Sequence, residues 1–205
     1  MRKIVGIDEV GRGPLAGPVT VCVVACHAKI YLKLKRDKRL PHAGKDSKKL
    51  SPAEREKYSA VLELLSRQKK IEFKIIHISN TIIDTKGISF CIKKAISDGI
   101  KKLKLDPKEC RILLDGSLMA PKEFKNQKMI IKGDEKEKII AWASILAKVS
   151  RDALMRRASK QFFQYGFENH KGYATVKHRL AISKNGLSVF HRKTFCRNLT
   201  RKALV

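Results

Sequence analysis

Long apolar runs are absent from this sequence of 205 residues, in which no 18 consecutive residues are apolar. A helix that crosses a bilayer needs about 20 such residues, so we expect no membrane-spanning helix. Two basic residues precede apolar ones at the N-terminus, as in a secretory leader, but Asp8, Glu9 and Arg12 interrupt that stretch. We therefore expect no signal peptide.

Cysteine pairs with the spacing of a zinc site are also absent. The sequence has no Cys-x-x-Cys pair, and its five cysteines are Cys22, Cys26, Cys91, Cys110 and Cys196. The number is odd, and the first three lie in apolar stretches. This pattern argues against a disulfide framework and predicts small, reduced core residues in a cytoplasmic protein.

Acidic residues are scarce, with 19 Asp and Glu against 46 Lys and Arg, for a formal net charge of +27. Between Lys148 and Lys202 there are fourteen basic residues and only two acids, Asp152 and Glu168. Such a field favours a polyanion, because neutralised phosphates release their counterions. We expect a nucleic-acid partner. The alternative is a basic protein without one; a membrane surface is disfavoured, since no basic amphipathic helix carries bulky aromatics.

Apolar residues make up 43% of the chain, enough for a core, and their pattern predicts an α/β fold. Short β-branched or apolar segments predict strands at 3–7, 18–26, 71–78, 111–114 and 127–131. Helical periodicity and cap signals predict helices at 51–67, 86–103, 134–159 and 175–184. The basic stretch 29–39 is predicted as an exposed strand edge or loop, and the tail after the last helix lacks structure signals. The first two strands should form a hairpin.

Carboxylates follow the predicted strands and open the long helix. Asp8 and Glu9 follow the first strand, Asp115 ends the fourth, and Asp134 starts the helix. If the first and fourth strands are parallel neighbours, Asp8 and Asp115 lie side by side, and such close charges repel unless cations separate them. Hard oxygen ligands select Mg²⁺ or Mn²⁺, and two such ions can hydrolyse a phosphodiester.

Each carboxylate also has an ordinary interpretation as a turn residue or helix cap. Adjacent strand residues point to opposite faces, so Asp8 and Glu9 cannot both reach one ion through side chains without a local bend. Glu9 would then contribute its backbone carbonyl. The turn Gly11-Arg12-Gly13 suits phosphate contact but also an ordinary turn. A tyrosine in 170–175 fits stacking on a base or sugar as well as core packing.

Together these segments resemble ribonuclease HII, the bacterial type 2 ribonuclease H. The matching stretches occur in the family's order along nearly the whole chain: GIDEVGRG at 6–13, LAGPV at 15–19, DSKKLS at 46–51, LDG at 114–116, KGD at 132–134, ASILAKV at 143–149, RD at 151–152 and HKGYAT at 170–175. The sequence departs from the family at Ser117 and Trp142, where other residues are usual. We interpret Asp152 as structural, paired with a nearby arginine.

The resemblance implies a ribonuclease H-like fold: a mixed five-stranded sheet flanked by helices in a catalytic domain over 1–155, and a C-terminal helical, basic, substrate-binding extension over 156–205. It implies an endonuclease that cleaves RNA in RNA–DNA hybrids and at single ribonucleotides in duplex DNA, leaving 5′-phosphate and 3′-hydroxyl ends. The implied catalytic residues, which also bind two Mg²⁺ or Mn²⁺ ions, are Asp8, Glu9, Asp115 and Asp134.

The resemblance also implies residues that contact nucleic acid. Gly11, Arg12 and Gly13 match the loop that reads the ribose 2′-hydroxyl, Tyr173 matches the tyrosine that packs on the sugar at the junction, and Lys48 matches a contact to the nearby phosphate. We expect a monomer. Two other classes stay open, namely a non-catalytic nucleic-acid-binding protein of ribosomal type and another nuclease of the same fold, such as a junction resolvase.

Overall fold

A single mixed sheet organises the computed structural model, which describes residues 2–41 and 50–201. Its order is β3-β2-β1-β4-β5, with strands β1 (Lys3–Val10), β2 (Val19–His27), β3 (Ile71–Ile78), β4 (Cys110–Asp115) and β5 (Gln127–Ile130). β1 pairs antiparallel with β2 and parallel with β4. The predicted five strands and the hairpin are confirmed, and the first and fourth strands are parallel neighbours.

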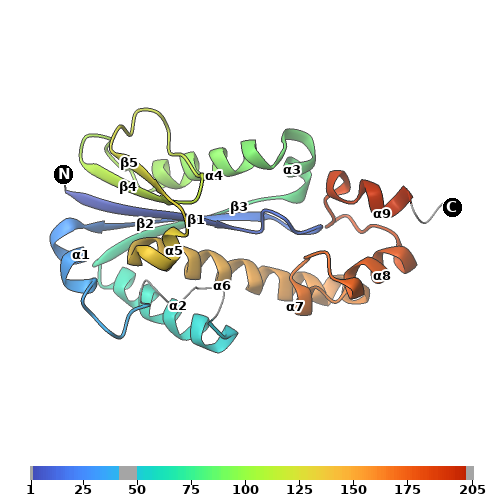
Figure 1. Ribbon diagram of the computed structural model, residues 1–205. Helices are drawn as coiled ribbons and strands as arrows, with labels where there is room; N and C mark the ends of the chain where they lie inside the picture. The colour runs from blue at the N-terminus through green and yellow to red at the C-terminus, as the bar shows by residue number, and fades with distance from the viewer. Residues whose placement is uncertain (1, 42–49, 202–205) are drawn as a thin grey trace.

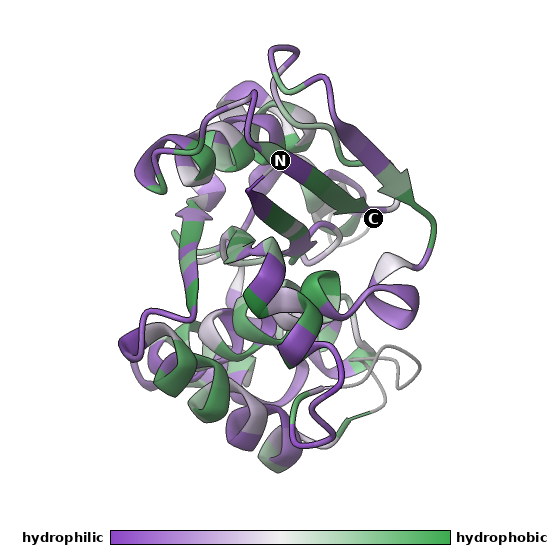
Figure 2. Ribbon diagram, turned by 90° about the vertical axis from the view of Figure 1, so that its left-hand side faces the viewer, coloured by the Kyte–Doolittle hydropathy of each residue, from purple (hydrophilic) through white to green (hydrophobic). Residues whose placement is uncertain are grey.

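Helices cover both faces of the sheet (Figure 1). One face carries α3 (Asn80–Lys86) and α4 (Ile88–Lys102); the other carries α1 (Ala28–Leu34), α2 (Pro52–Arg67) and α6 (Lys138–Gln161). The short α5 (Gly133–Lys136) precedes α6, and the C-terminal part holds η1 (Phe163–Tyr165), α7 (Phe167–His170), α8 (Val176–Asn185), η2 (Lys193–Phe195) and α9 (Arg197–Arg201). In Figure 2 the strands carry hydrophobic stretches, whereas the peripheral turns are mostly hydrophilic.

Strand β2, which lies between β3 and β1, is buried on both faces, as its β-branched sequence predicts. Val21 and Val23 belong to the core under α4, whereas Cys22 and Val24 belong to the core under α6. This alternation follows from the two-residue period of a strand. All five cysteines are buried and free, which confirms the prediction of reduced core residues.

Helix α6 crosses the sheet in close contact with β1. A Cβ atom added to Gly6 would lie 2.3 Å from the carbonyl oxygen of Ile139, so only glycine permits this approach. The packing places Ser144, in the first half of α6, beside Asp8 near the C-terminal end of β1. α6 also runs without a break through residue 155, so the proposed boundary between 155 and 156 falls inside a helix and stays a prediction.

Two sequence predictions of secondary structure are wrong, and one segment without structure signals is ordered. Residues 28–34 form α1 and not a strand edge or loop, because Ile30, Tyr31 and Leu34 share a helical side that packs on the sheet. The helix expected over 134–159 is two helices, since Glu137 has extended backbone between them. The tail is ordered through η2 and α9, and it buries Arg192 and Cys196. Among the helices described, none combines the length and apolar character needed for a membrane crossing.

A third core, in the C-terminal part, packs against a neutral histidine pair, His178 and His191. His178 Nδ1 lies 2.9 Å from the Tyr173 carbonyl, which only accepts, so this nitrogen carries the proton. His178 Nε2 therefore accepts from His191 Nε2 at 3.1 Å, and His191 Nδ1 accepts from the Ser188 amide at 2.9 Å. A further proton on either ring would place two N–H groups face to face, and no hydrogen bond could form between them. Burial lowers the pKa of each histidine to about 4.

We expect the free energy of unfolding to decrease as pH falls from 6.5 towards 4. In this pH window the histidines of the unfolded chain take up protons, whereas those of the folded protein do not. The histidines' contribution to the free energy of unfolding is therefore fully present above pH 6.5 and is lost as pH falls towards 4, by about 3 kcal/mol per histidine. Urea unfolding between pH 4 and 8 measures this. His191→Gln keeps a donor near the Nε2 position but does not titrate, so its loss should be smaller; an equal loss contradicts the assignment.

Candidate active site

The parallel pairing of β1 with β4 brings two carboxylates together. Ile7 pairs with Leu114, and both side chains belong to the core under α4. The next residues, Asp8 and Asp115, therefore point to the α6 side of the sheet. Both line a cavity of about 380 Å³, whose walls are Asp8, Glu9, Val10, Arg55, Asp115, Ser144, Lys148 and Tyr173.

Asp8 is the most enclosed of the carboxylates in this cavity, with 5% of its surface exposed. One of its oxygens accepts the Glu9 amide N–H at 2.7 Å, and the Ser144 hydroxyl also hydrogen-bonds to it. Burial raises the pKa of Asp8 well above its usual range, and the charges of Glu9 and Asp115 raise it further. The site therefore holds an anion at a cost that a cation would relieve.

Glu9 lines the same cavity as Asp8, contrary to the expectation that strand alternation turns it away. β4 pairs with β1 only as far as Ile7, so the last residues of β1 have no strand beside them on that edge. Residues on opposite faces of β1, such as Asp8 and Glu9, can then reach the same cavity around the unpaired edge of the strand. Burial raises the pKa of Glu9. The charge of Arg12, whose Nη1 atom lies 3.5 Å from Glu9 Oε1, lowers this pKa, and the charge of Asp115 raises it.

Asp115 connects the cavity to the start of α5. Its Oδ1 atom accepts the Gly133 amide N–H at 2.6 Å, and a Cβ atom on Gly133 would lie 2.7 Å from Ile140. Asp134 is the next residue and has 3% of its surface exposed. The structure thus brings three of the four predicted carboxylates to the cavity, whereas Asp134 is buried next to Gly133 and is not among the residues that line the cavity.

The donor set of this cavity fits a hard divalent cation. Three carboxylates meet under mutual repulsion, and carboxylate oxygens are the ligands that Mg²⁺ and Mn²⁺ prefer. Across residues 2–41 and 50–201, no three Asp, Glu, His or Cys side chains already stand close enough to hold one ion. Binding therefore requires the carboxylates to close around the cation.

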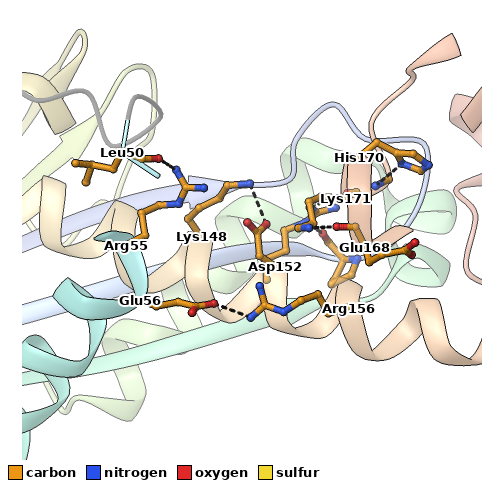
Figure 3. A network of polar contacts seen from close by, with 12 residues as sticks. Leu50, Arg55, Glu56, Lys148, Asp152, Arg156, Glu168, His170 and Lys171 are labelled. Atoms are coloured by element: carbon orange, nitrogen blue, oxygen red, sulfur yellow. Dashed lines mark hydrogen bonds and ion pairs between the residues drawn. The ribbon is translucent and has the colours of Figure 1, made fainter. Parts of the chain in front are cut away.

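Two cations on the cavity wall were not predicted from the sequence. Arg55 of α2 is buried and donates to the Leu50 carbonyl, and Lys148 of α6 pairs with Asp152 at 2.9 Å (Figure 3). The predicted arginine partner of Asp152 is thus wrong. Ser144, Lys148 and Asp152 are spaced four residues apart on α6, and this spacing could have predicted that they lie on the same face of the helix. An ion pair from Glu56 to Arg156 at 3.0 Å joins α2 to α6 nearby.

The predicted substrate residues lie beside these carboxylates. The turn Gly11–Gly13 directly follows β1, and Gly11 has a φ of 87°. Tyr173 lines the cavity with 41% of its surface exposed, and its ring centre lies 6.0 Å from the Arg151 guanidinium. Lys48 lies outside the described residues.

The sequence profile of the ribonuclease HII family matches residues 5–198 of this chain. A ribonuclease HII of Clostridium botulinum strain Hall is 39% identical over 96% of this chain and 68% of its own. The ribonuclease HII of Endomicrobium trichonymphae is 41% identical over 94% of this chain and 84% of its own.

Solved structures share the fold at lower identity. The ribonuclease H2 of Pyrococcus horikoshii OT3 superimposes with a TM-score of 0.76 over 98% of this chain and 99% of its own, at 23% identity. Archaeoglobus fulgidus RNase HII, solved in complex with PCNA, gives 0.71 over 96% of both chains at 24% identity. Bst-RNase HIII, solved in complex with Mn²⁺, gives 0.71 over 99% of this chain and 69% of its own at 17% identity.

The mixed sheet, the helices on both faces and the carboxylates at the ends of β1 and β4 define a ribonuclease H, a phosphodiester hydrolase with the ribonuclease H-like fold. Within that class, the family profile and the relatives near 40% identity are decisive. The chain belongs to the ribonuclease HII family.

We expect Asp8→Asn to stabilise the protein when divalent ions are absent, by about 1–2 kcal/mol. The change removes a buried charge that Glu9 and Asp115 repel, while the amide oxygen can still accept the Glu9 N–H. Urea unfolding in EDTA measures the effect. Asp98→Asn is the control, because Asp98 forms only a surface ion pair with Lys94 on α4. An Asp8→Asn protein less stable than wild type contradicts the repulsion.

Proposed function

We propose that this chain is a divalent-metal-dependent endonuclease that cleaves RNA in RNA–DNA hybrids and at single ribonucleotides within duplex DNA. Membership of the ribonuclease HII family supports the hybrid as substrate. The observation that carries the proposal is the meeting of Asp8, Glu9 and Asp115 in one cavity whose wall also holds Arg55 and Lys148. Anionic ligands for a metal thus lie beside cations for a phosphate.

Asp8, Glu9 and Asp115 would hold two Mg²⁺ or Mn²⁺ ions, with Asp134 as a further ligand. When bound, the ions supply an activated water and neutralise charge at the scissile phosphate, which leaves 5′-phosphate and 3′-hydroxyl ends. The chain's own residues orient the site. Ser144 and the Glu9 amide hold the Asp8 carboxylate, and the Gly133 amide holds that of Asp115.

Cations next to the cavity would hold the nucleic-acid backbone. Arg55 suits a phosphate because its guanidinium is a planar fork of donors, and Lys148 adds a second positive charge. Beyond the cavity, the basic segment 156–205 is proposed to extend this contact as a substrate-binding region. The expectations of a monomer and of a cytoplasmic location stay predictions.

Recognition of ribose would come from the Gly11–Gly13 turn and Tyr173, which lie next to the carboxylates. RNA differs from DNA at the 2′-hydroxyl, so a reader of sugar identity must place polar groups close to that atom. The turn leaves open space beside Gly13, where an added Cβ atom would meet nothing within 4 Å. Tyr173 offers an exposed ring on which a sugar could pack.

The decisive assay uses duplex DNA that contains one ribonucleotide, with Mg²⁺ or Mn²⁺. We expect a single cut on the 5′ side of the ribonucleotide, and a loss of at least about a hundredfold in kcat for Asp8→Asn and Asp115→Asn, because both remove a metal ligand. Product ends are read by gel mobility and by phosphatase treatment.

The same assay separates the alternatives. Asp98→Asn should cut at the wild-type rate, since that carboxylate lies on α4, away from the cavity. Binding without cleavage at any metal concentration would favour a non-catalytic binding protein. Preference for branched DNA without ribonucleotides would favour a junction resolvase. Full activity in both cavity variants would overturn the site.

Two glycine variants of the turn should behave in opposite ways. Gly11→Ala should destabilise the fold by about 1–3 kcal/mol, because Gly11 has a positive φ and its Cβ would lie 2.3 Å from Arg151 Nε. Gly13→Ala should leave stability unchanged but lower kcat/KM about tenfold, because its methyl group would occupy the space proposed for the ribose. Unfolding curves and initial rates test the pair; normal kinetics of Gly13→Ala would contradict this placement.

A further inference from the structure

Two arginines lie fully buried under the turn that joins β1 to β2. Arg151 of α6 and Arg192 of the C-terminal segment each have 0% of their surface exposed. In the part of the chain that the structure describes, neither guanidinium forms an ion pair with a carboxylate. Arg151 instead donates to the carbonyls of Ala16, Pro18 and Lys171 at 2.9–3.2 Å. A buried charge is tolerated only when such hydrogen bonds satisfy it.

Arg192 binds the turn itself. Its guanidinium donates to the carbonyls of Gly11, Arg12 and Gly17 at 2.6, 2.9 and 2.9 Å. The first two carbonyls belong to the turn that we propose as the reader of ribose. Arg192 is therefore a direct connection between the C-terminal segment and the edge of the cavity.

The segment that carries Arg192 is itself fixed. The Arg192 amide donates to the Leu15 carbonyl at 2.7 Å, and Asn80 of α3 donates to the His191 carbonyl at 2.9 Å. Asp84 of α3 accepts the amide N–H groups of Lys193 and Thr194. The backbone that carries the Arg192 guanidinium is therefore held in place, as a side chain that positions a turn requires.

The bonds to Arg192 decide where two amide groups of the turn point. A trans peptide is planar, and its C=O and N–H point in opposite directions. Because the Gly11 and Arg12 carbonyls point at Arg192, the N–H groups of Arg12 and Gly13 point away from it. Within the described residues, neither N–H has a protein acceptor. They form two successive free donors, and the space beside them is open where a Cβ atom on Gly13 would meet nothing within 4 Å.

Arginine suits this task better than any other residue. Its planar guanidinium can donate to three carbonyls at once, whereas the donors of a lysine ammonium are all on one nitrogen atom. A buried arginine adds less stability than a well-packed apolar residue would, so stability alone does not account for it. Arg151 packs closely against the turn, since a Cβ atom added to Gly11 would lie 2.3 Å from its Nε atom and 2.8 Å from its Cδ atom.

We propose that Arg192 is a positioning residue for sugar discrimination, which fixes the Gly11–Gly13 turn so that the Arg12 and Gly13 amides present donors to the ribose 2′-hydroxyl. The inference rests on the proposed function of that turn. Arg192 does not touch the substrate; it acts through the backbone of the turn. Loss of the clamp should therefore affect the distinction between ribose and deoxyribose and not the general affinity for duplexes.

The test compares Arg192→Lys with wild type and with Arg67→Lys, the same substitution at an exposed site on α2. Fluorescence anisotropy in EDTA gives Kd for two duplexes of one sequence, one all-DNA and one with a single ribonucleotide. We expect the ratio of the two Kd values to fall about tenfold in Arg192→Lys, as for one misplaced hydrogen-bond donor pair, with Kd for the all-DNA duplex unchanged. Arg67→Lys should keep the wild-type ratio.

Amide hydrogen exchange of the peptide spanning residues 11–18 is the second readout, and it should speed up in Arg192→Lys alone. If wild type shows no preference for the ribonucleotide, the proposed function fails, and the exchange rates still decide whether Arg192 holds the turn. Arg192→Gln, whose amide can bind one carbonyl, replaces Arg192→Lys if the latter does not fold. A folded variant with an unchanged Kd ratio and unchanged exchange overturns the proposal.

Discussion

Repulsion between Asp8 and Asp115 follows from the parallel pairing of β1 with β4, and the rest of the site is arranged around it. The pairing ends at Ile7 and Leu114, so the next residues meet at one end of the sheet on the α6 side. Their charges are partly buried, and Glu9 joins them around the free edge of β1. Divalent cations relieve such repulsion, and a polyanion can approach because the surrounding protein is strongly basic.

Helix α6 and the C-terminal segment both converge on the end of β1. Gly6 allows α6 to pack against β1, which brings Ser144 to Asp8 and Lys148 to the cavity wall. Further along α6, Arg151 donates to the Ala16 carbonyl in the connection between β1 and β2. Arg192, from the C-terminal segment, donates to the Gly11 carbonyl in the same connection. The proposed metal ligands, phosphate contacts and ribose-reading turn thus share one structural support.

Much of this arrangement could be predicted from the sequence, because apolar patterning and cap residues act locally. The five strands, the capping box at Ser51 and the meeting of Asp8 with Asp115 follow from such signals. The break at Glu137 could not be predicted, since the charged run over residues 134–138 contains no proline or glycine that would end a helix. The role proposed for Arg192 could not be predicted for a different reason: its partners are backbone carbonyls, which every residue has. Glu9 was misplaced because the alternation rule assumes a strand with neighbours on both edges.

The most direct measurement is the position of Mn²⁺ in crystals of the protein grown with that ion, located by its anomalous scattering. The account predicts that Mn²⁺ binds between the carboxylates of Asp8 and Asp115, with a second ion about 4 Å away near Glu9 or Asp134. It also predicts that both carboxylates turn towards the metal. Mn²⁺ bound only at other places on the protein, with Asp8 and Asp115 left without it, would contradict the account.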